Sequence, residues 1–139
     1  MTVFICRTDD LGKIRNIRTM IFNKELRISL NDIFDDDDQK LEQFLIMKNN
    51  YIIGTFRLRT ENNSYKIERM GILQGFRSKG FGKIALEEII MYSKKMNKPK
   101  IILDSIYTMR DFYAKSGFIQ IGNVYSKVGI PHVKMYIHL

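Results

Sequence analysis

The sequence predicts an α/β fold of the α+β kind: one domain, residues 1–139, in which helices flank a mixed, mainly antiparallel sheet of about seven strands. Three observations support this fold class. The chain has 139 residues, the length of a single domain. It is 45% hydrophobic and 27% charged, which is globular composition. Strand-like and helix-like segments follow one another in the order β-α-β-β-β-α-β-α-β-β, without an internal repeat or linker.

The first two elements are a strand and a helix. Residues 3–7 are a short apolar run typical of a strand. Asp9 or Asp10 can then cap a helix that ends near Leu26. Helical spacing predicts that its buried face consists of Leu11, Ile14, Ile17, Ile21 and Phe22. Periodicity is lost over residues 27–40, where the four aspartates 35–38 indicate a solvated loop rather than a calcium site.

An antiparallel meander follows. Residues 42–48 and 51–59 are two strand-like runs joined by Asn49-Asn50, which predicts a β-hairpin. Asn62-Asn63 is a second turn, and it leads into a third strand over residues 64–73.

The second half alternates helices with strands. Apolar residues at helical spacing run from Gly80 to about Met96, where Asn97-Lys98-Pro99 ends the helix. Gly117 is placed to cap a second helix. The segments expected here are the helices 80–96 and 108–116 and the strands 100–104, 118–125 and 132–139.

Charge and cysteine content restrict the classes of function. The formal charge of +8 indicates an anionic partner. Lysine and arginine are spread along the chain rather than gathered in an arm, so nucleic acid is not the favoured partner. Cys6 is the only cysteine, which excludes an intramolecular disulfide and a cysteine-based metal site. The sequence contains neither a signal peptide nor a bilayer-spanning run, so we expect a cytoplasmic protein without membrane attachment.

The most informative segment is the basic, glycine-bearing turn Arg77-Ser78-Lys79-Gly80-Phe81-Gly82. It lies between a predicted strand and a predicted helix, where unpaired backbone N–H groups and the helix dipole attract an anion. The turn therefore predicts a ligand that contains phosphate. It is not a P-loop, because Gly82-Lys83 is followed by Ile84 instead of serine or threonine.

A dinucleotide fingerprint is a serious alternative. Gly80, Gly82 and Ala85 satisfy G-x-G-x-x-[GA], and Asp104 follows at a suitable distance. Against it, the polar residues 74–79 separate the strand from the first glycine. The strand itself also alternates in polarity, which suits a mixed or antiparallel sheet better than a buried parallel one.

A third interpretation includes Arg77 in the pattern R-x-x-G-x-G. With the second segment Phe112-Tyr113-Ala114-Lys115-Ser116-Gly117-Phe118, the chain resembles the GNAT family of N-acetyltransferases, whose acetyl-CoA motif is [QR]-x-x-G-x-[GA] and whose later signature is F-Y-x-K-x-G-F. The segments 67–70 and 129–135 are similar to the bacterial ElaA-like members. The resemblance covers nearly the whole chain.

The resemblance implies a site for acetyl-CoA as cosubstrate, without a metal. The main chain of Met70, Gly71 and Ile72 would pair with the pantetheine arm, and the Ile72 N–H would polarise the thioester carbonyl. Gly71 within a strand is also typical of a bulge or a close backbone approach. The pyrophosphate would be held by Arg77, Ser78, Lys79, Gly80, Phe81, Gly82 and Lys83.

Three residues are candidates for proton transfer. Tyr113 is the candidate general acid, because a phenol is protonated at neutral pH and can donate to a leaving thiolate. Glu68 points to the same strand face as Met70 and could be the base if burial raised its pKa; a Glu68–arginine pair is the alternative. His132 is the other candidate base, and a structural role is its alternative.

The acceptor is expected to be a primary amine of a small molecule or peptide, attacked directly without an acyl-enzyme. Glu25 and the acids 35–38 are where ElaA-like members carry acidic residues, which hints at a substrate rim. Ile106 replaces the asparagine or glutamine that family members often use to bind the cofactor. A non-catalytic CoA or nucleotide-binding module and a basic RNA-binding protein are the alternatives, and either a monomer or a homodimer is compatible with the sequence.

Overall fold

The computed structural model describes residues 2–139, and within them the strands form one seven-stranded sheet in the order β1-β2-β3-β4-β5-β7-β6. Neighbouring strands are antiparallel, except that β4 and β5 are parallel. This arrangement confirms the predicted fold class. The strands are β1 Val3–Arg7, β2 Glu42–Lys48, β3 Tyr51–Glu61, β4 Ser64–Ile72, β5 Lys100–Ile106, β6 Ile119–Lys127 and β7 Ile130–His138.

The three predicted helices are present, and short helical turns are added between them. The N-terminal helix is α-helical as α1, Leu11–Arg18, and continues in π-helical turns as η1, Thr19–Glu25. The major later helices are α3, Phe81–Lys95, and α4, Arg110–Ala114. Short 3-10 turns, η3 and η4, precede them at Gln74–Phe76 and Tyr107–Met109. Within the described part of the chain, no helix is both long and apolar enough to cross a membrane.

The prediction of a solvated loop over residues 27–40 is wrong. The structure has a short helix α2, Leu30–Ile33, and a 3-10 turn η2, Asp36–Gln39. Each begins at a capping side chain: Ser29 accepts from the Asn31 N–H, and Asp35 accepts from the Asp37 N–H. Side-chain caps of this kind start short helical turns. Because each turn has only four residues, it shows no hydrophobic period in the sequence.

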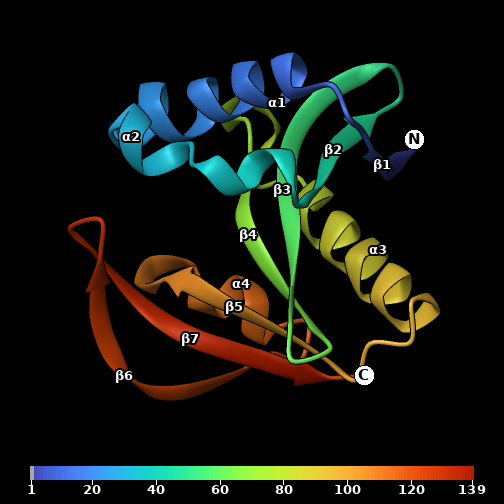
Figure 1. Cartoon of the computed structure of the whole chain (residues 1–139), viewed down its shortest axis with the longest axis vertical. Helices are drawn as coiled ribbons and strands as arrows, with labels where there is room; N and C mark the ends of the chain where they lie inside the picture. The colour runs from blue at the N-terminus through green and yellow to red at the C-terminus, as the bar shows by residue number, and fades with distance from the viewer. Residues whose placement is uncertain (1) are drawn as a thin grey trace.

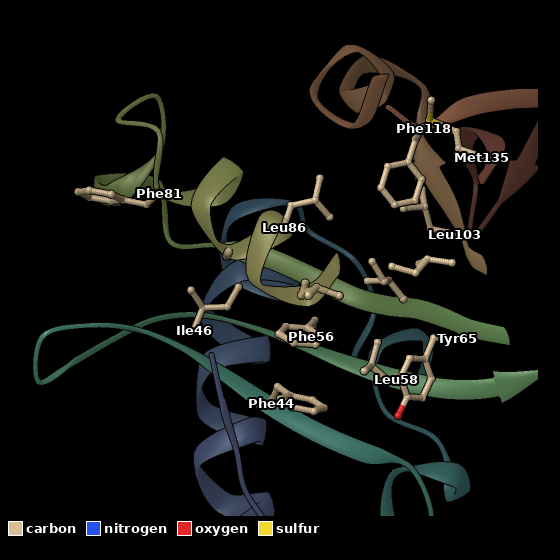
Figure 2. Packing of buried hydrophobic residues seen from close by; sticks show 14 of the residues in the cluster. Phe44, Ile46, Phe56, Leu58, Tyr65, Phe81, Leu86, Leu103, Phe118 and Met135 are labelled. Atoms are coloured by element: carbon tan, nitrogen blue, oxygen red, sulfur yellow. The ribbon is translucent and has the colours of Figure 1, made fainter. Parts of the chain in front are cut away.

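Helices cover both faces of the sheet (Figure 1). On one face, α1, η1 and α2 bury Ile14, Ile17, Ile21 and Ile33 against Leu45 of β2. On the other face, α3 packs its Leu86 and Ile89 over the strands, and the aromatic side chains beneath it include a stacked Phe44–Phe56 pair with centroids 4.6 Å apart (Figure 2). Of the five side chains predicted to form the buried face of the helix 11–26, four are buried: Ile14, Ile17, Ile21 and Phe22.

The sheet splits between its two parallel strands. β4 and β5 pair over three residues only, Tyr65–Ile67 with Ile101–Leu103. Beyond this contact the strands diverge, β4 staying with β3 and β5 with β7 (Figure 1). The apolar side chains near the pairing hold the two halves together, and the divergence leaves a gap on the side of the glycine-bearing turn.

A bulge in β4 contributes to the divergence. The register shifts between Thr55 and Arg57 of β3, and Arg69 on β4 has a φ of +55°. The bulge therefore lies one to two residues before Gly71. Gly71 itself allows β4 and η1 to approach closely, because a Cβ there would lie 2.7 Å from Cγ2 of Ile21 on η1.

The last hairpin is tighter than its sequence indicated. β6 and β7 are joined by Val128 and Gly129, with φ angles of +49° and +74°. Two consecutive positive φ angles make a tight hairpin turn, and valine at the first position concealed it. His132 is consequently inside β7 instead of at its start.

Candidate functional site

Two cavities meet at the split between β4 and β5. The larger has a volume of about 580 Å³ and is bordered by the glycine-bearing turn; the smaller has a volume of about 190 Å³ and lies toward β7. The cavities share one wall. The side chains that border both are Phe22, Met70, Ile106, Met109 and Tyr113.

The turn before α3 has the backbone conformation of an anion cradle. Ser78 and Gly80 have positive φ angles of +60° and +83°, and Gly80 is the N-cap of α3. No side chain caps this helix, and its first turn contains no acidic residue. The backbone N–H groups of the first turn are therefore free to bind a negatively charged ligand at the edge of the larger cavity.

The two sequence motifs meet in space at Gly82. A Cβ on Gly82 would lie 3.2 Å from two ring atoms of Phe112. Glycine at this position thus lets α4 approach the start of α3. The ring of Phe112 in turn meets that of Tyr113 edge to face, with centroids 5.0 Å apart. Both motifs border the larger cavity as a result.

Arg77 does not extend freely toward a ligand. Its guanidinium forms an ion pair with Glu25 and donates from Nε to the Ile72 carbonyl at 2.7 Å. Glu25 also accepts from the Gln74 N–H at 3.1 Å. The rim charge expected from Arg77 is therefore neutralised, and Glu25 lies on the side of the glycine-bearing turn instead of at a substrate rim.

Ile72 presents its main chain to the gap. The Leu73 N–H donates to the Ile53 carbonyl at 2.8 Å. In an antiparallel ladder, successive residues point their polar groups to opposite sides, so those of Ile72, opposite Gly54, are directed away from β3. The Ile72 carbonyl accepts the hydrogen bond from Arg77. The Ile72 N–H faces the larger cavity, which Ile72 lines.

Tyr113 lies in the wall between the cavities. Burial raises the pKa of its phenol to about 12. The hydroxyl therefore keeps its proton throughout the neutral range. Its ring is held edge to face against Phe118, with centroids 5.9 Å apart.

Glu68 does not have the raised pKa that a general base would need. Burial alone would raise the pKa, but hydrogen bonds and charges from Arg59 and Arg57 outweigh burial and lower it. Arg57 approaches the carboxylate to 2.8 Å, Arg59 to 3.2 Å and Lys66 to 3.7 Å. The Glu68–arginine pair, the alternative weighed from the sequence, is what forms.

His132 borders the smaller cavity and is 7% exposed. Its Nδ1 lies 2.7 Å from the Ile130 carbonyl. A carbonyl only accepts hydrogen bonds, so Nδ1 carries the proton, and in the neutral ring Nε2 has the free lone pair.

The aspartate run is an arginine-binding element. Arg57, with its side chain 1% exposed, contacts Asp35 and Asp38 at 2.8 Å each, and Arg18 contacts Asp38 at 2.7 Å. Hydrogen bonding from Arg57 is the main cause that lowers the pKa of Asp35 to about 2. These carboxylates are thus committed to internal cations. Within residues 2–139, no three His, Cys, Asp or Glu side chains form a group suited to a metal ion.

Sequence reasoning missed a second polar cluster in the smaller cavity. Asp104 accepts a hydrogen bond from Tyr125 and pairs with Lys66 at 3.1 Å and Lys127 at 3.2 Å. Burial alone would raise the pKa of Asp104, but these partners lower it strongly. The available signal was the alternation of β4, which points Lys66 and Glu68 to one face, next to a strand carrying Asp104.

Comparison with known proteins identifies the family. Residues 17–139 match the model of an acetyltransferase (GNAT) domain. A relative from Bacillus subtilis, the uncharacterized protein YyaT, is 32% identical over 129 residues, which are 91% of this chain and 87% of that protein.

Solved structures share the fold at lower identity. A candidate N-acetyltransferase from Lactobacillus plantarum superposes with a TM-score of 0.89 at 20% identity, covering 100% of this chain and 99% of that one. Escherichia coli ElaA has a TM-score of 0.83 at 19% identity, with 97% and 99% covered. A GNAT family acetyltransferase from Elizabethkingia anophelis with acetyl-CoA bound has a TM-score of 0.74 at 19% identity, with 99% and 98% covered. The match over residues 17–139, together with the two motifs that meet at Gly82, establishes that this chain belongs to the GNAT family of acetyltransferases.

Proposed function

We propose that this protein transfers the acetyl group of acetyl-CoA directly to a primary amine held in the smaller cavity, with Tyr113 as general acid. The observation that carries the proposal is the position of Tyr113. Its protonated, partly buried phenol lies in the wall shared by the two cavities, between the expected donor and acceptor.

The residues around the larger cavity fit acetyl-CoA. The uncapped start of α3 and the left-handed residues Ser78 and Gly80 provide N–H groups for a pyrophosphate. The basic side chains of Lys79 and Lys83 add positive charge near this turn. The solved GNAT structure with acetyl-CoA bound supports the same assignment here. Acetyl-CoA would supply the activated acetyl group as a thioester.

The end of β4 would orient and polarise that group. The main chain of Met70, Gly71 and Ile72 borders the gap and can pair with an extended pantetheine arm. The Ile72 N–H can donate to the thioester oxygen as charge develops there. A preorganised donor of this kind stabilises the transition state by about 3 kcal/mol.

The reaction needs two proton transfers. The amine nitrogen forms a bond to the acetyl carbon, the C–S bond breaks, and the departing thiolate takes the Tyr113 proton, which solvent then replaces. The attacking nitrogen loses a proton, and His132 is the base we assign because its Nε2 has a free lone pair and it lines the acceptor cavity. Glu68 and Asp104 have lowered pKa values and are poor bases at neutral pH.

A thiol-release assay across a panel of amines tests this function with Tyr113→Phe. We expect kcat to fall by about 10²- to 10⁴-fold while calorimetry shows unchanged acetyl-CoA affinity. Tyr107→Phe is the control, because Tyr107 borders neither cavity and stacks under Arg110. Equal rates for wild type and Tyr113→Phe would refute the general-acid role. Acetyl-CoA binding without turnover of any amine would make the protein a binding module.

A further inference from the structure

We infer that the acceptor carries an anionic group close to its amine, and that Lys127 at the mouth of the smaller cavity binds that group. This inference rests on the proposed function and narrows the class of acceptor from any primary amine to an amine that also bears a carboxylate or a phosphate.

Two of the three carboxylates that line the smaller cavity, Glu68 and Asp104, are already saturated by cations. Glu68 has three cationic neighbours within 4 Å, two of them arginines. Asp104 has Lys66, Lys127 and Lys134 within the same limit, together with the Tyr125 hydroxyl. Neither carboxylate has an oxygen left uncompensated for a second ammonium group of the acceptor. A polyamine or a lysine-rich peptide would therefore find no free counter-charge at these residues.

The network around these carboxylates carries an excess of positive charge. Among the described residues, it links seven cations to five carboxylates through contacts of 4 Å or less. The one further carboxylate of the cavity lining, Asp32, is exposed on α2 and reduces the excess from two charges to one. The side chains that line the cavity are balanced, with Lys66, Arg69 and Lys127 against Asp32, Glu68 and Asp104. The excess positive charge therefore comes from the residues behind this lining, and it favours an anion near the cavity. The seven cations are Arg18, Arg57, Arg59, Lys66, Arg69, Lys127 and Lys134.

Of the cations that line the cavity, Lys127 is the most exposed and has hydrogen-bond donors left for a ligand. Its side chain is 37% exposed and its Nζ contacts one carboxylate oxygen, on Asp104 at 3.2 Å. Because an ammonium has three N–H donors, two remain. Lys66 is 16% exposed and is shared between Glu68 and Asp104. Arg69 donates from Nε to the Ile33 carbonyl and pairs with Asp35. Lys127 also borders the cavity together with His132 and Tyr113, so an anion bound to it would leave the amine near the proposed catalytic groups.

Paired acceptors test the inference. Glycine is compared with glycinamide for a carboxylate, and O-phosphoethanolamine with ethanolamine for a phosphate. Each is assayed with wild type, Lys127→Gln and Lys134→Gln by thiol release. Lys134→Gln is the matched control, because Lys134 loses the same charge and also neighbours Asp104, at 3.8 Å, but does not line the cavity.

Lys127→Gln should lower kcat/KM at least about fivefold for the anionic member of a pair, through KM, and leave the neutral member unchanged. Lys134→Gln should change both members by less than about twofold. Comparing each acceptor with itself across variants removes the effect of amine basicity. A response with glycine alone assigns a carboxylate, one with phosphoethanolamine alone assigns a phosphate, and both results support the inference.

Two results would overturn it: neutral amines preferred by wild type, or Lys127→Gln lowering turnover of neutral and anionic amines equally. Calorimetry of the same acceptors with the CoA-loaded protein separates this inference from the proposed function. Binding of anionic amines that depends on Lys127, without turnover of any amine, would refute catalysis and retain the anion site. Turnover of amines without any Lys127-dependent preference would retain catalysis and refute the anion site.

Discussion

Arg77 donates a hydrogen bond from its Nε to the carbonyl oxygen of Ile72 at 2.7 Å. This contact joins the turn that leads into α3 to the end of β4. The motif arginine thus acts on the strand residue whose N–H we assign to thioester polarisation, and Glu25 at the end of η1 fixes the guanidinium there. Three separate segments meet at this point, which makes Glu25 a positioning residue for the turn.

Glu25→Gln removes the ion pair to Arg77 and should raise the KM for acetyl-CoA several-fold while lowering the free energy of unfolding by less than about 1 kcal/mol. The small stability effect is expected because the Arg77 side chain is 38% exposed. Steady-state kinetics and urea denaturation measure the two effects. Arg7→Met, which removes an exposed pair with Glu42, is the control and should leave KM unchanged. An unaltered KM in Glu25→Gln would remove the positioning role.

Gly82→Ala should lower kcat on the order of ten- to a hundredfold, because the new Cβ pushes Phe112 and shifts the neighbouring Tyr113. The companion substitution Phe112→Leu should restore part of the loss by making room. Gly75→Ala is the control, since a Cβ there meets nothing within 4 Å. If the double variant is no better than Gly82→Ala, the contact with Phe112 is not the cause.

Arg57→Met should lower the free energy of unfolding by about 3–5 kcal/mol, because it leaves the carboxylates of Asp35, Asp38 and Glu68 without their shared buried cation. Arg59→Met, a change on the same strand at a side chain that is 28% exposed, should cost less than about 1 kcal/mol. Chemical denaturation measures both. Similar losses for the two variants would contradict the central place of Arg57 in the network.

The pH dependence of kcat should have no alkaline limb from Tyr113 up to about pH 10.5. Burial raises the pKa of its phenol from 10.0 to about 12, so the acid form, which donates the proton, persists above the range where a free tyrosine ionises. Rates at saturating acetyl-CoA and amine between pH 7 and 10.5 measure this. A limb with a midpoint near 10 that disappears in Tyr113→Phe would contradict the raised pKa.

The order of elements could be predicted because each long element has its own period. The helix starting after Gly80 and the meander from residue 42 follow directly from apolar spacing. The meeting of Gly82 with Phe112 could be anticipated only through resemblance, since nothing local in either segment refers to the other. The main features of the larger cavity were thus accessible from sequence.

The polar contacts in the interior could not be predicted from the sequence. Asp35 and Asp38 look solvated because their partner Arg57 lies about twenty residues away, in a strand that pattern alone assigns to the core. For Glu68 the sequence left two outcomes open, a pKa raised by burial or an arginine pair; that three cations converge on this carboxylate and lower its pKa depends on the fold. A bulge was anticipated at Gly71 but lies one to two residues earlier, because the left-handed φ occurs at Arg69, a residue type that seldom adopts it.

The brief pairing of β4 with β5 leaves a row of amide groups without a strand opposite them. Past Ile67, the β5-facing N–H groups of β4 have no partner strand to shield them from exchange with deuterium. An extended ligand in the gap would take the place of the missing strand. We therefore expect the Ile72 amide to exchange quickly in the free protein and to become protected on binding acetyl-CoA, whereas the amides of β3 facing β2 should not change. The gap in the sheet thus makes amide exchange a direct reporter of cosubstrate binding, independent of any acceptor.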